Sequence, residues 1–301
     1  MCMTDDKLRN LYRDLRSVDF DPAQKPCAWE NLTDVLEILA VGKGIKPAHL
    51  NGCGLQSPSL LTALESVAAK HGLRTLRTRP PRPPQYQEPG VPRGFLEWQQ
   101  ASQRRAASTA GEVLWLYHNP SLRTSIERLL DGGGDETEVL GYPACCVRAR
   151  REIGTRLIEA LVAGYRRQYG AVTVPDLIRC AEQDLAVALP MSLWTADQDS
   201  RRRFPFVQFT ACAPCLRRAD SPAARVNAAM QSLAGAVDAG LVHAIVEAAQ
   251  RLPMAWGGPV CQGGKESSHL GSVTRKPRRN DRCPCGSGRK YKRCCGRFVS
   301  V

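Results

Sequence analysis

The chain has 301 residues, of which 43% are hydrophobic and 24% charged, a composition that excludes a fibrous or intrinsically disordered protein. Its formal net charge is +13. Ten lysines and arginines, against a single aspartate, lie between Arg275 and Arg297, so this segment alone carries +9. The charge is therefore concentrated near the C-terminus, and any partner inferred from it is a partner of that segment.

The sequence favours a cytoplasmic protein without a membrane span. The first residues, MCMTDDKLRN, lack the basic region and apolar run of a secretory signal, and no stretch approaches the roughly 18 to 20 apolar residues of a spanning helix. The cytoplasm is reducing, and closely spaced cysteines there are more often metal ligands or catalytic thiols than disulfides. Of the thirteen cysteines, eight fall into two groups of four.

In chain order, residues 1–76 are predicted to be a helical region. LRNLYRDL (8–15) and LTDVLEIL (32–39) place apolar residues at helical spacing, and Ser57-Pro58 begins a third such run in the manner of a capped helix. Residues 77–94 follow with six prolines, which disfavour both a helix and a central strand. We therefore expect a proline-rich linker there.

Residues 95–253 are predicted to form an α/β or α+β domain that is rich in helix. VLWLY (113–117) and FPFVQF (204–209) are apolar runs typical of buried strands. Helical periodicity predicts helices over three further segments: SLRTSIERLL (121–130), the long segment after GYPACC, and the pair from Ser221 to Gln250.

The chain ends in a cysteine tail (residues 280–298), which a Gly-, Ser-, Lys- and Arg-rich tether (254–279) is expected to join flexibly to the body (residues 1–253). The tail offers four sulfur atoms from thirteen residues to one tetrahedral zinc ion: Cys283, Cys285, Cys294 and Cys295. Its basic residues offset the negative charge of four thiolates around zinc. So short a segment buries no core, so metal binding must supply its folding free energy, on the order of 10 kcal/mol. An iron or iron–sulfur site, two disulfides and free thiols are the alternatives.

The sequence NDRCPCGSGRKYKRCCG (280–296) resembles the SEC-C motif, the small zinc-binding tail of the bacterial preprotein translocase ATPase SecA, which also ends many otherwise unrelated bacterial proteins. In the translocase the fourth ligand is commonly histidine, and Cys295 takes its place here. The resemblance implies zinc and a small zinc-binding segment that contacts proteins or ribosomes. It does not imply translocation, because the chain has no Walker-type GxxxxGK[ST] sequence.

A second cysteine group lies in the middle of the chain, as Cys145-Cys146 in GYPACC and as Cys212 and Cys215 in ACAPC. Each pair precedes a predicted helix, whose N-terminus lowers the pKa of a thiol. We predict that the four cysteines converge in space and share a metal ion or an iron–sulfur cluster. A redox-active CxxC and buried structural cysteines are the alternatives. GYPACC also resembles some uncharacterised prokaryotic families with a GYPxCC sequence, a likeness that adds no role.

These features favour three functions. The first is a cytosolic zinc-binding adaptor whose basic tail docks on an acidic protein surface or on the ribosome. The second is a metal, iron–sulfur or thiol-redox enzyme that uses the second cysteine group. The third is RNA binding through the tail, although only Tyr291 and Phe298 are available there to stack on bases. No catalytic or dinucleotide-binding pattern is present and the five histidines are isolated, so the sequence predicts no particular reaction or substrate.

Overall fold

The computed structural model describes residues 2–18, 28–51, 58–80, 90–109, 111–187, 189 and 198–251. The chain divides into two units, residues 1–155 with 196–254, and residues 156–195 with 255–301. The tether, the cysteine tail, Ser57 and residues 81–89 of the proline-rich linker lie outside the described residues.

Most of the described residues are helical. Residues 198–203 form a short helix in addition to the helices named next. The helices are α1 (Asp5–Arg16), α2 (Ala28–Lys43), α3 (Pro58–Lys70), α4 (Arg93–Thr109), α5 (Leu122–Leu130), α6 (Glu136–Leu140), α7 (Ala144–Tyr169), α8 (Val174–Glu182), α10 (Ala213–Arg217), α11 (Pro222–Val237) and α12 (Ala239–Gln250). The predicted helix-rich body with a minor β component is confirmed.

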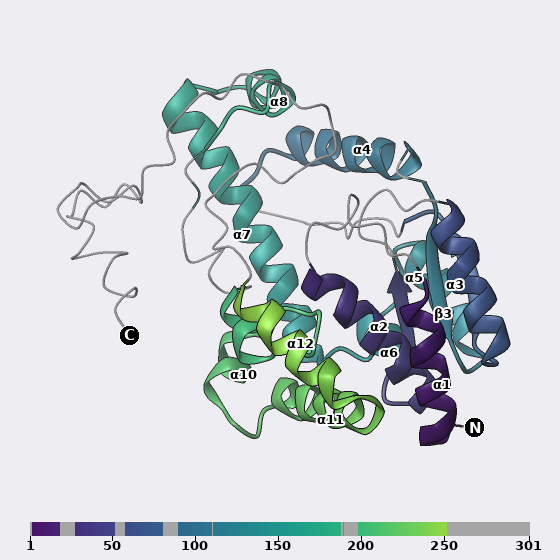
Figure 1. Ribbon diagram of the computed structural model, residues 1–301. Coiled ribbons are helices and arrows are strands. Elements are labelled where there is room, and N and C mark those ends of the chain that lie inside the picture. Colours follow the sequence, from purple (N-terminus) through teal and green to yellow (C-terminus); the bar gives the residue numbers. More distant parts are fainter. Residues whose placement is uncertain are drawn as a thin grey trace, which may run out of the picture. The chain divides into compact units, whose positions relative to one another are not determined.

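The first unit contains a three-stranded antiparallel sheet with the strand order β1-β3-β2 (Figure 1). The central strand is β3 (Val113–Tyr117), and it pairs with β1 (Ala48–Asn51) on one side and β2 (Arg74–Thr78) on the other. Strands from both sides of the proline-rich segment thus form one sheet. The predicted boundary at residue 76 lies inside β2.

The strand β3 is buried at all five positions, because helices cover both faces of the sheet. Successive side chains of a strand point to opposite faces. Trp115 and Tyr117 pack in one hydrophobic cluster with α5 and α6, whereas Leu114 and Leu116 pack in the cluster that α1, α2 and α3 form. This double burial explains why VLWLY is apolar throughout, and the predicted strand is confirmed.

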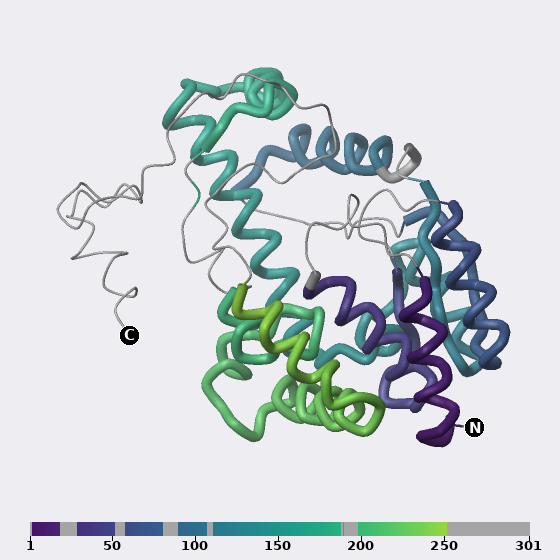
Figure 2. The backbone as a smooth tube through the Cα atoms, viewed as in Figure 1, coloured from purple at the N-terminus to yellow at the C-terminus, as the bar shows by residue number. Residues whose placement is uncertain are grey.

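The helix α2 is central to the first unit and packs on α1, α11, α12, β1 and β3. The chain path in Figure 2 shows how α11 and α12, at the end of the described residues, return to lie beside the N-terminal helices. Residues 33–42 of α2 are all buried. A helix buried on every side is usually apolar all round, yet this stretch contains Asp34 and Glu37.

Three strand assignments differ from the sequence prediction. The prediction of a strand over FPFVQF (204–209) is wrong, because the segment is a turn followed by irregular chain. Its aromatic residues are nevertheless buried in the core, and an apolar run of this length does not by itself distinguish a strand from other buried chain. The strands β1 and β2 were not predicted, because AHLN and RTLRT are short and contain several polar residues, so the region 1–76 is not helical throughout.

In the second unit, the structure describes the C-terminal part of α7 and the helix α8. A capping box begins α8: Thr173 accepts a hydrogen bond from the N–H of Asp176, and the Asp176 carboxylate accepts one from the N–H of Thr173. None of the helices in the described part of the chain has the length and apolarity that crossing a membrane requires.

Candidate metal centre

Four cysteines that are distant in sequence meet in the first unit and form the four-cysteine cluster: Cys145, Cys146, Cys212 and Cys215. Every pair of their sulfur atoms lies within 4.8 Å. The Sγ atom of Cys145 is 3.6 Å from that of Cys215 and 3.9 Å from that of Cys146, and the Cys146 and Cys215 sulfurs are 3.8 Å apart. All four are free thiols. The predicted convergence is confirmed.

The cluster is assembled where helices begin. Cys145 and Cys146 lie in the first turn of α7, Cys212 is the N-cap of α10, and Cys215 lies within α10. The backbone N–H of Cys212 donates a hydrogen bond to the Cys146 sulfur at 3.4 Å, and the N–H of Ala223 in the first turn of α11 donates one to Cys215. Backbone N–H groups at helix starts stabilise negative charge, so this environment favours thiolates.

Burial and hydrogen bonding shift the pKa values of these thiols in opposite directions. Burial raises the pKa of the Cys146 thiol and that of the Cys212 thiol. Burial also opposes ionisation of Cys215, but hydrogen bonds from Ala223 and from the neighbouring thiols outweigh it and lower the pKa of Cys215. A bound cation removes the conflict, because it stabilises all four sulfurs as thiolates.

The distances among the sulfurs fit a single tetrahedral ion. Zinc–sulfur bonds of about 2.3 Å place the four sulfurs of a tetrahedral site about 3.8 Å apart. The separations among the sulfurs of Cys145, Cys146 and Cys215, 3.6 to 3.9 Å, agree with this value, and the Cys212 sulfur lies within 4.8 Å of each of them. An iron–sulfur cluster places several iron and sulfide atoms between its cysteines and needs wider spacing. The residues present therefore fit one zinc ion with four thiolate ligands.

The two cysteine-bearing segments share a short pattern that the sequence analysis missed. Tyr142 and Phe209 each lie three residues before the first cysteine of their pair, and an alanine directly precedes that cysteine. The two aromatic rings pack against each other with centroids 5.1 Å apart. Gly141 starts the first segment with φ +69°, and a Cβ atom there would lie 2.8 Å from Pro47. The GYPACC segment therefore needs glycine at this position for its backbone and for its close packing.

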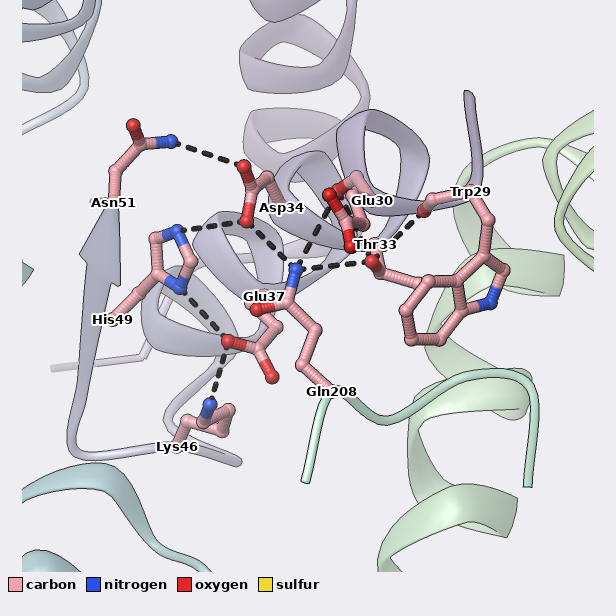
Figure 3. A network of polar contacts seen from close by, with 9 residues as sticks. All are labelled: Trp29, Glu30, Thr33, Asp34, Glu37, Lys46, His49, Asn51 and Gln208. Carbon is pink, nitrogen blue, oxygen red and sulfur yellow. Dashed lines mark hydrogen bonds and ion pairs between the residues drawn. The ribbon is translucent and has the colours of Figure 1, made fainter. Parts of the chain in front are cut away.

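Figure 3 shows a second feature of the same unit, a buried polar network that involves α2, the loop before β1, β1 itself and the segment before Cys212. Its members are Thr33, Asp34, Glu37, Lys46, His49, Asn51 and Gln208. All except the part-buried Gln208 are less than 5% exposed. Buried charges of this kind are retained in proteins only when they are paired and hydrogen-bonded.

Glu37 is the anion at one end of this network. Its Oε2 atom lies 2.8 Å from the Lys46 ammonium and 2.8 Å from Nδ1 of His49. Burial alone would raise the pKa of Glu37, but the charge of Lys46 and the hydrogen bond with His49 lower it to about 2. Glu37 is therefore an anion at neutral pH, and β1 and its preceding loop are fixed to α2 through it.

Asp34 is the anion at the other end. One of its carboxylate oxygens accepts a hydrogen bond from Gln208 at 2.7 Å, and the other accepts one from Asn51 at 3.3 Å. Gln208 also donates to the Thr33 hydroxyl at 3.0 Å. Nε2 of His49 lies 3.7 Å from Asp34 and so joins the two ends. The sequence marks His49 only as an isolated histidine, so its role in a charged network was not predicted.

The comparisons with known proteins match only short stretches of the chain. Residues 279–297 match the SEC-C motif, a zinc-binding motif. SecA, the protein translocase subunit, is 78% identical over 23 residues in Sulfurovum sp. (strain NBC37-1), which is 8% of this chain and 3% of that protein. In Clostridium botulinum (strain Eklund 17B / Type B) it is 47% identical over 60 residues, which is 19% of this chain and 7% of that protein. No solved structure matches the chain.

The chain therefore carries a SEC-C motif near its C-terminus, as the sequence predicted. It spans only a few per cent of the length of these curated relatives, so their activity does not transfer to it. The four tail cysteines, Cys283, Cys285, Cys294 and Cys295, lie outside the described residues.

Proposed function

We propose that this protein is a cytoplasmic zinc-binding adaptor with two zinc centres, one in the SEC-C tail and one in the body. The body centre is the four-cysteine cluster, and the observation that carries it is the spacing of its sulfur atoms, 3.6 to 3.9 Å in three pairs. Four thiolates without an open coordination position are typical of a structural zinc site. In this proposal the body zinc stabilises the starts of α7 and α10 and performs no reaction.

The tail is the contact module of the adaptor. Its four cysteines bind the second zinc ion, and the charge of +9 between Arg275 and Arg297 directs it to an acidic protein surface or to the ribosome. The match to the SEC-C motif supports the zinc site, and the concentration of basic residues supports an electrostatic contact. Exposed charges act over about 8 to 10 Å at physiological salt, so such a contact weakens as salt is added.

A thiol-redox enzyme is the second candidate for the body, and an iron–sulfur enzyme is a variant of it that requires the four sulfurs to move apart from the spacing described above. Cys145 is partly exposed, its sulfur is 3.6 Å from that of Cys215, and the pKa of Cys215 is lowered because hydrogen bonds outweigh its burial. A thiolate beside an accessible thiol is the arrangement that redox-active pairs use. An iron–sulfur protein is coloured, whereas a zinc protein is not.

Metal analysis of the purified full-length protein tests the proposal. We expect two zinc ions per chain, one in Cys146→Ser, one in Cys294→Ser, and no visible absorbance. If the wild-type protein contains iron and is brown, and Cys146→Ser has lost both properties, the body site is the iron–sulfur form of the second candidate and not a structural zinc site. Zinc content that is unaffected by Cys146→Ser would remove the body centre altogether.

A further inference from the structure

The buried polar network contacts both segments that carry the ligands of the four-cysteine cluster. We propose that this network holds the two segments in the metal-binding arrangement before a metal ion arrives. Lys46 and Gln208 act as positioning residues, because they touch the cysteine-bearing segments and not the metal. This inference rests on the proposed zinc centre in the body and concerns what determines its affinity.

Gln208 holds the segment that leads to Cys212. It lies four residues before that cysteine, and its amide donates to Asp34 at 2.7 Å and to Thr33 at 3.0 Å. The segment has no regular secondary structure, so its position depends on such side-chain contacts. Ser200 fixes the next residues, because its hydroxyl donates to the carbonyl of Phe209 at 3.4 Å and accepts the N–H of Ala211 at 2.7 Å.

Lys46 holds the segment that leads to Cys145. Its ammonium is paired with Glu37 of α2 at 2.8 Å and lies 4.6 Å from the centre of the Tyr142 ring. A cation is attracted to the face of an aromatic ring, and the attraction is stronger where both are shielded from water. Tyr142 in turn packs on Phe209, so the contact between the rings joins the two segments just before their cysteines. Both segments are thus fastened to α2 and to each other.

The energetics favour a positioning role over a purely stabilising one. A buried ion pair loses the hydration of both ions, and well-packed apolar residues of similar volume often give equal or greater stability. What charged and hydrogen-bonded partners add is a defined geometry. Ligands that folding has already ordered bind a metal more tightly, because no further ordering accompanies binding.

Asp34 provides a matched pair of variants. Gln208 and Asn51 each donate one hydrogen bond to its carboxylate, but Gln208 belongs to a cysteine-bearing segment and Asn51 belongs to β1, which carries no cysteine. Gln208→Met and Asn51→Leu remove these donors with little change in side-chain volume. A general loss of stability affects both variants, whereas a loss of ligand positioning affects Gln208→Met alone.

The experiment uses the full chain with Cys294→Ser and Cys295→Ser, so that the body holds the remaining proposed site. Zinc affinity is measured by competition with a chelator, and Co²⁺ serves as a coloured probe of tetrahedral thiolate coordination. We expect Gln208→Met to weaken zinc binding about tenfold, as changes behind a first ligand shell commonly do. Asn51→Leu should stay within about twofold of the parent, because no cysteine-bearing segment loses a contact.

A second readout separates positioning from stability. Zinc raises the unfolding temperature of the parent, since it binds the folded state. In Gln208→Met the difference between the loaded and unloaded unfolding temperatures should shrink, whereas in Asn51→Leu both temperatures should fall together. If Gln208→Met does not fold, Thr33→Val takes its place, because it removes the network hydroxyl that accepts a hydrogen bond from Gln208.

Suppose that the parent binds one zinc ion. If Gln208→Met and Asn51→Leu then have equal zinc affinities, whether both unchanged or both weakened, the positioning role is overturned. A parent that binds no zinc would instead overturn the proposed body centre, and the positioning role would fail with it. The two failures are therefore distinguishable by the stoichiometry of the parent.

Discussion

The two cysteine groups differ in how the chain brings four sulfur atoms together. In the tail the cysteines lie within thirteen residues, so a local turn is sufficient to gather them. In the body they come from the starts of α7 and α10 and meet only when the first unit is folded around its hydrophobic core. If both groups bind zinc as proposed, metal binding folds the tail, whereas folding of the body prepares its metal site.

The largest expected effect concerns the tail. Cys294→Ser should remove its zinc and with it a folding free energy on the order of 10 kcal/mol, because the segment has no core of its own. NMR spectra of the full-length variant should lose the dispersed signals of residues 280–298 and keep those of the body. Signals of a folded tail that persist in Cys294→Ser, or in the wild type treated with a chelator, would contradict this account.

The next effect concerns the buried ion pair of the body. Lys46→Met should destabilise the first unit by about 3–5 kcal/mol, because it leaves the buried Glu37 charge without its partner. Lys43→Met is the matched control, since Lys43 pairs with Asp5 at the surface and should contribute at most about 1 kcal/mol. Urea unfolding of the two variants measures the difference. Similar losses in both would show that the network contributes no more than a surface contact.

Zinc removal should affect the body less than it affects the tail. With zinc at about a thousand times its Kd, binding stabilises the folded body by about 4 kcal/mol, and a chelator or Cys146→Ser should abolish this gain. Cys180→Ser is the control, because Cys180 is equally buried but outside both cysteine groups. Calorimetry should find that the unfolding temperature of Cys180→Ser still depends on zinc and that of Cys146→Ser does not.

Acid should weaken the body through Glu37. The ordinary pKa of this carboxyl is 4.5, and the charge of Lys46 together with the His49 hydrogen bond outweighs burial to lower it to about 2 in the folded protein. Its contribution is therefore fully present above pH 4.5 and is lost as the pH falls towards 2, by at most about 3 kcal/mol. In zinc-free protein, Glu37→Gln should lose less stability than the wild type over this interval. Parallel pH profiles would contradict the shift.

The smallest expected effect concerns the partner of the tail. A combined variant should weaken partner capture without releasing zinc, because the substituted residues contribute charge and no ligand. It replaces four basic residues by Gln: Arg289, Lys290, Lys292 and Arg293. Each exposed charge is worth about 1 kcal/mol or less. Capture from a cell extract at low and high salt measures the effect. Capture that is insensitive both to the substitutions and to salt would exclude an electrostatic contact.

The sequence was most informative where the chemistry is local. The spacing of the tail cysteines and their basic neighbours identified the SEC-C motif, and the position of Cys145 and Cys212 before predicted helices was enough to predict their convergence. VLWLY was recognised as a strand because burial on both faces requires an unbroken apolar run. FPFVQF looked the same, yet its aromatics fill the core from irregular chain.

The buried network was beyond the reach of such patterns. Asp34 and Glu37 interrupt an apolar helix, but their partners Lys46, His49 and Gln208 lie up to 174 residues away in sequence. The periodicity of apolar residues predicts which face of a helix is buried. It does not predict which residues pair with a buried charge on that helix. The available signal was a pair of acidic residues one turn apart in a mostly apolar stretch of helix. This signal identifies a network only when the tertiary partners of the two residues are known.

The central claim is that the body holds one zinc ion among four cysteine sulfurs, independently of the tail. X-ray absorption at the zinc edge tests it most directly, on the full chain with Cys294→Ser and Cys295→Ser. The account predicts four sulfur neighbours at about 2.3 Å and no neighbouring metal atom. The claim would be contradicted by nitrogen or oxygen neighbours in place of these sulfurs, or by a second metal atom nearby. A chain that retains no zinc would contradict it as well.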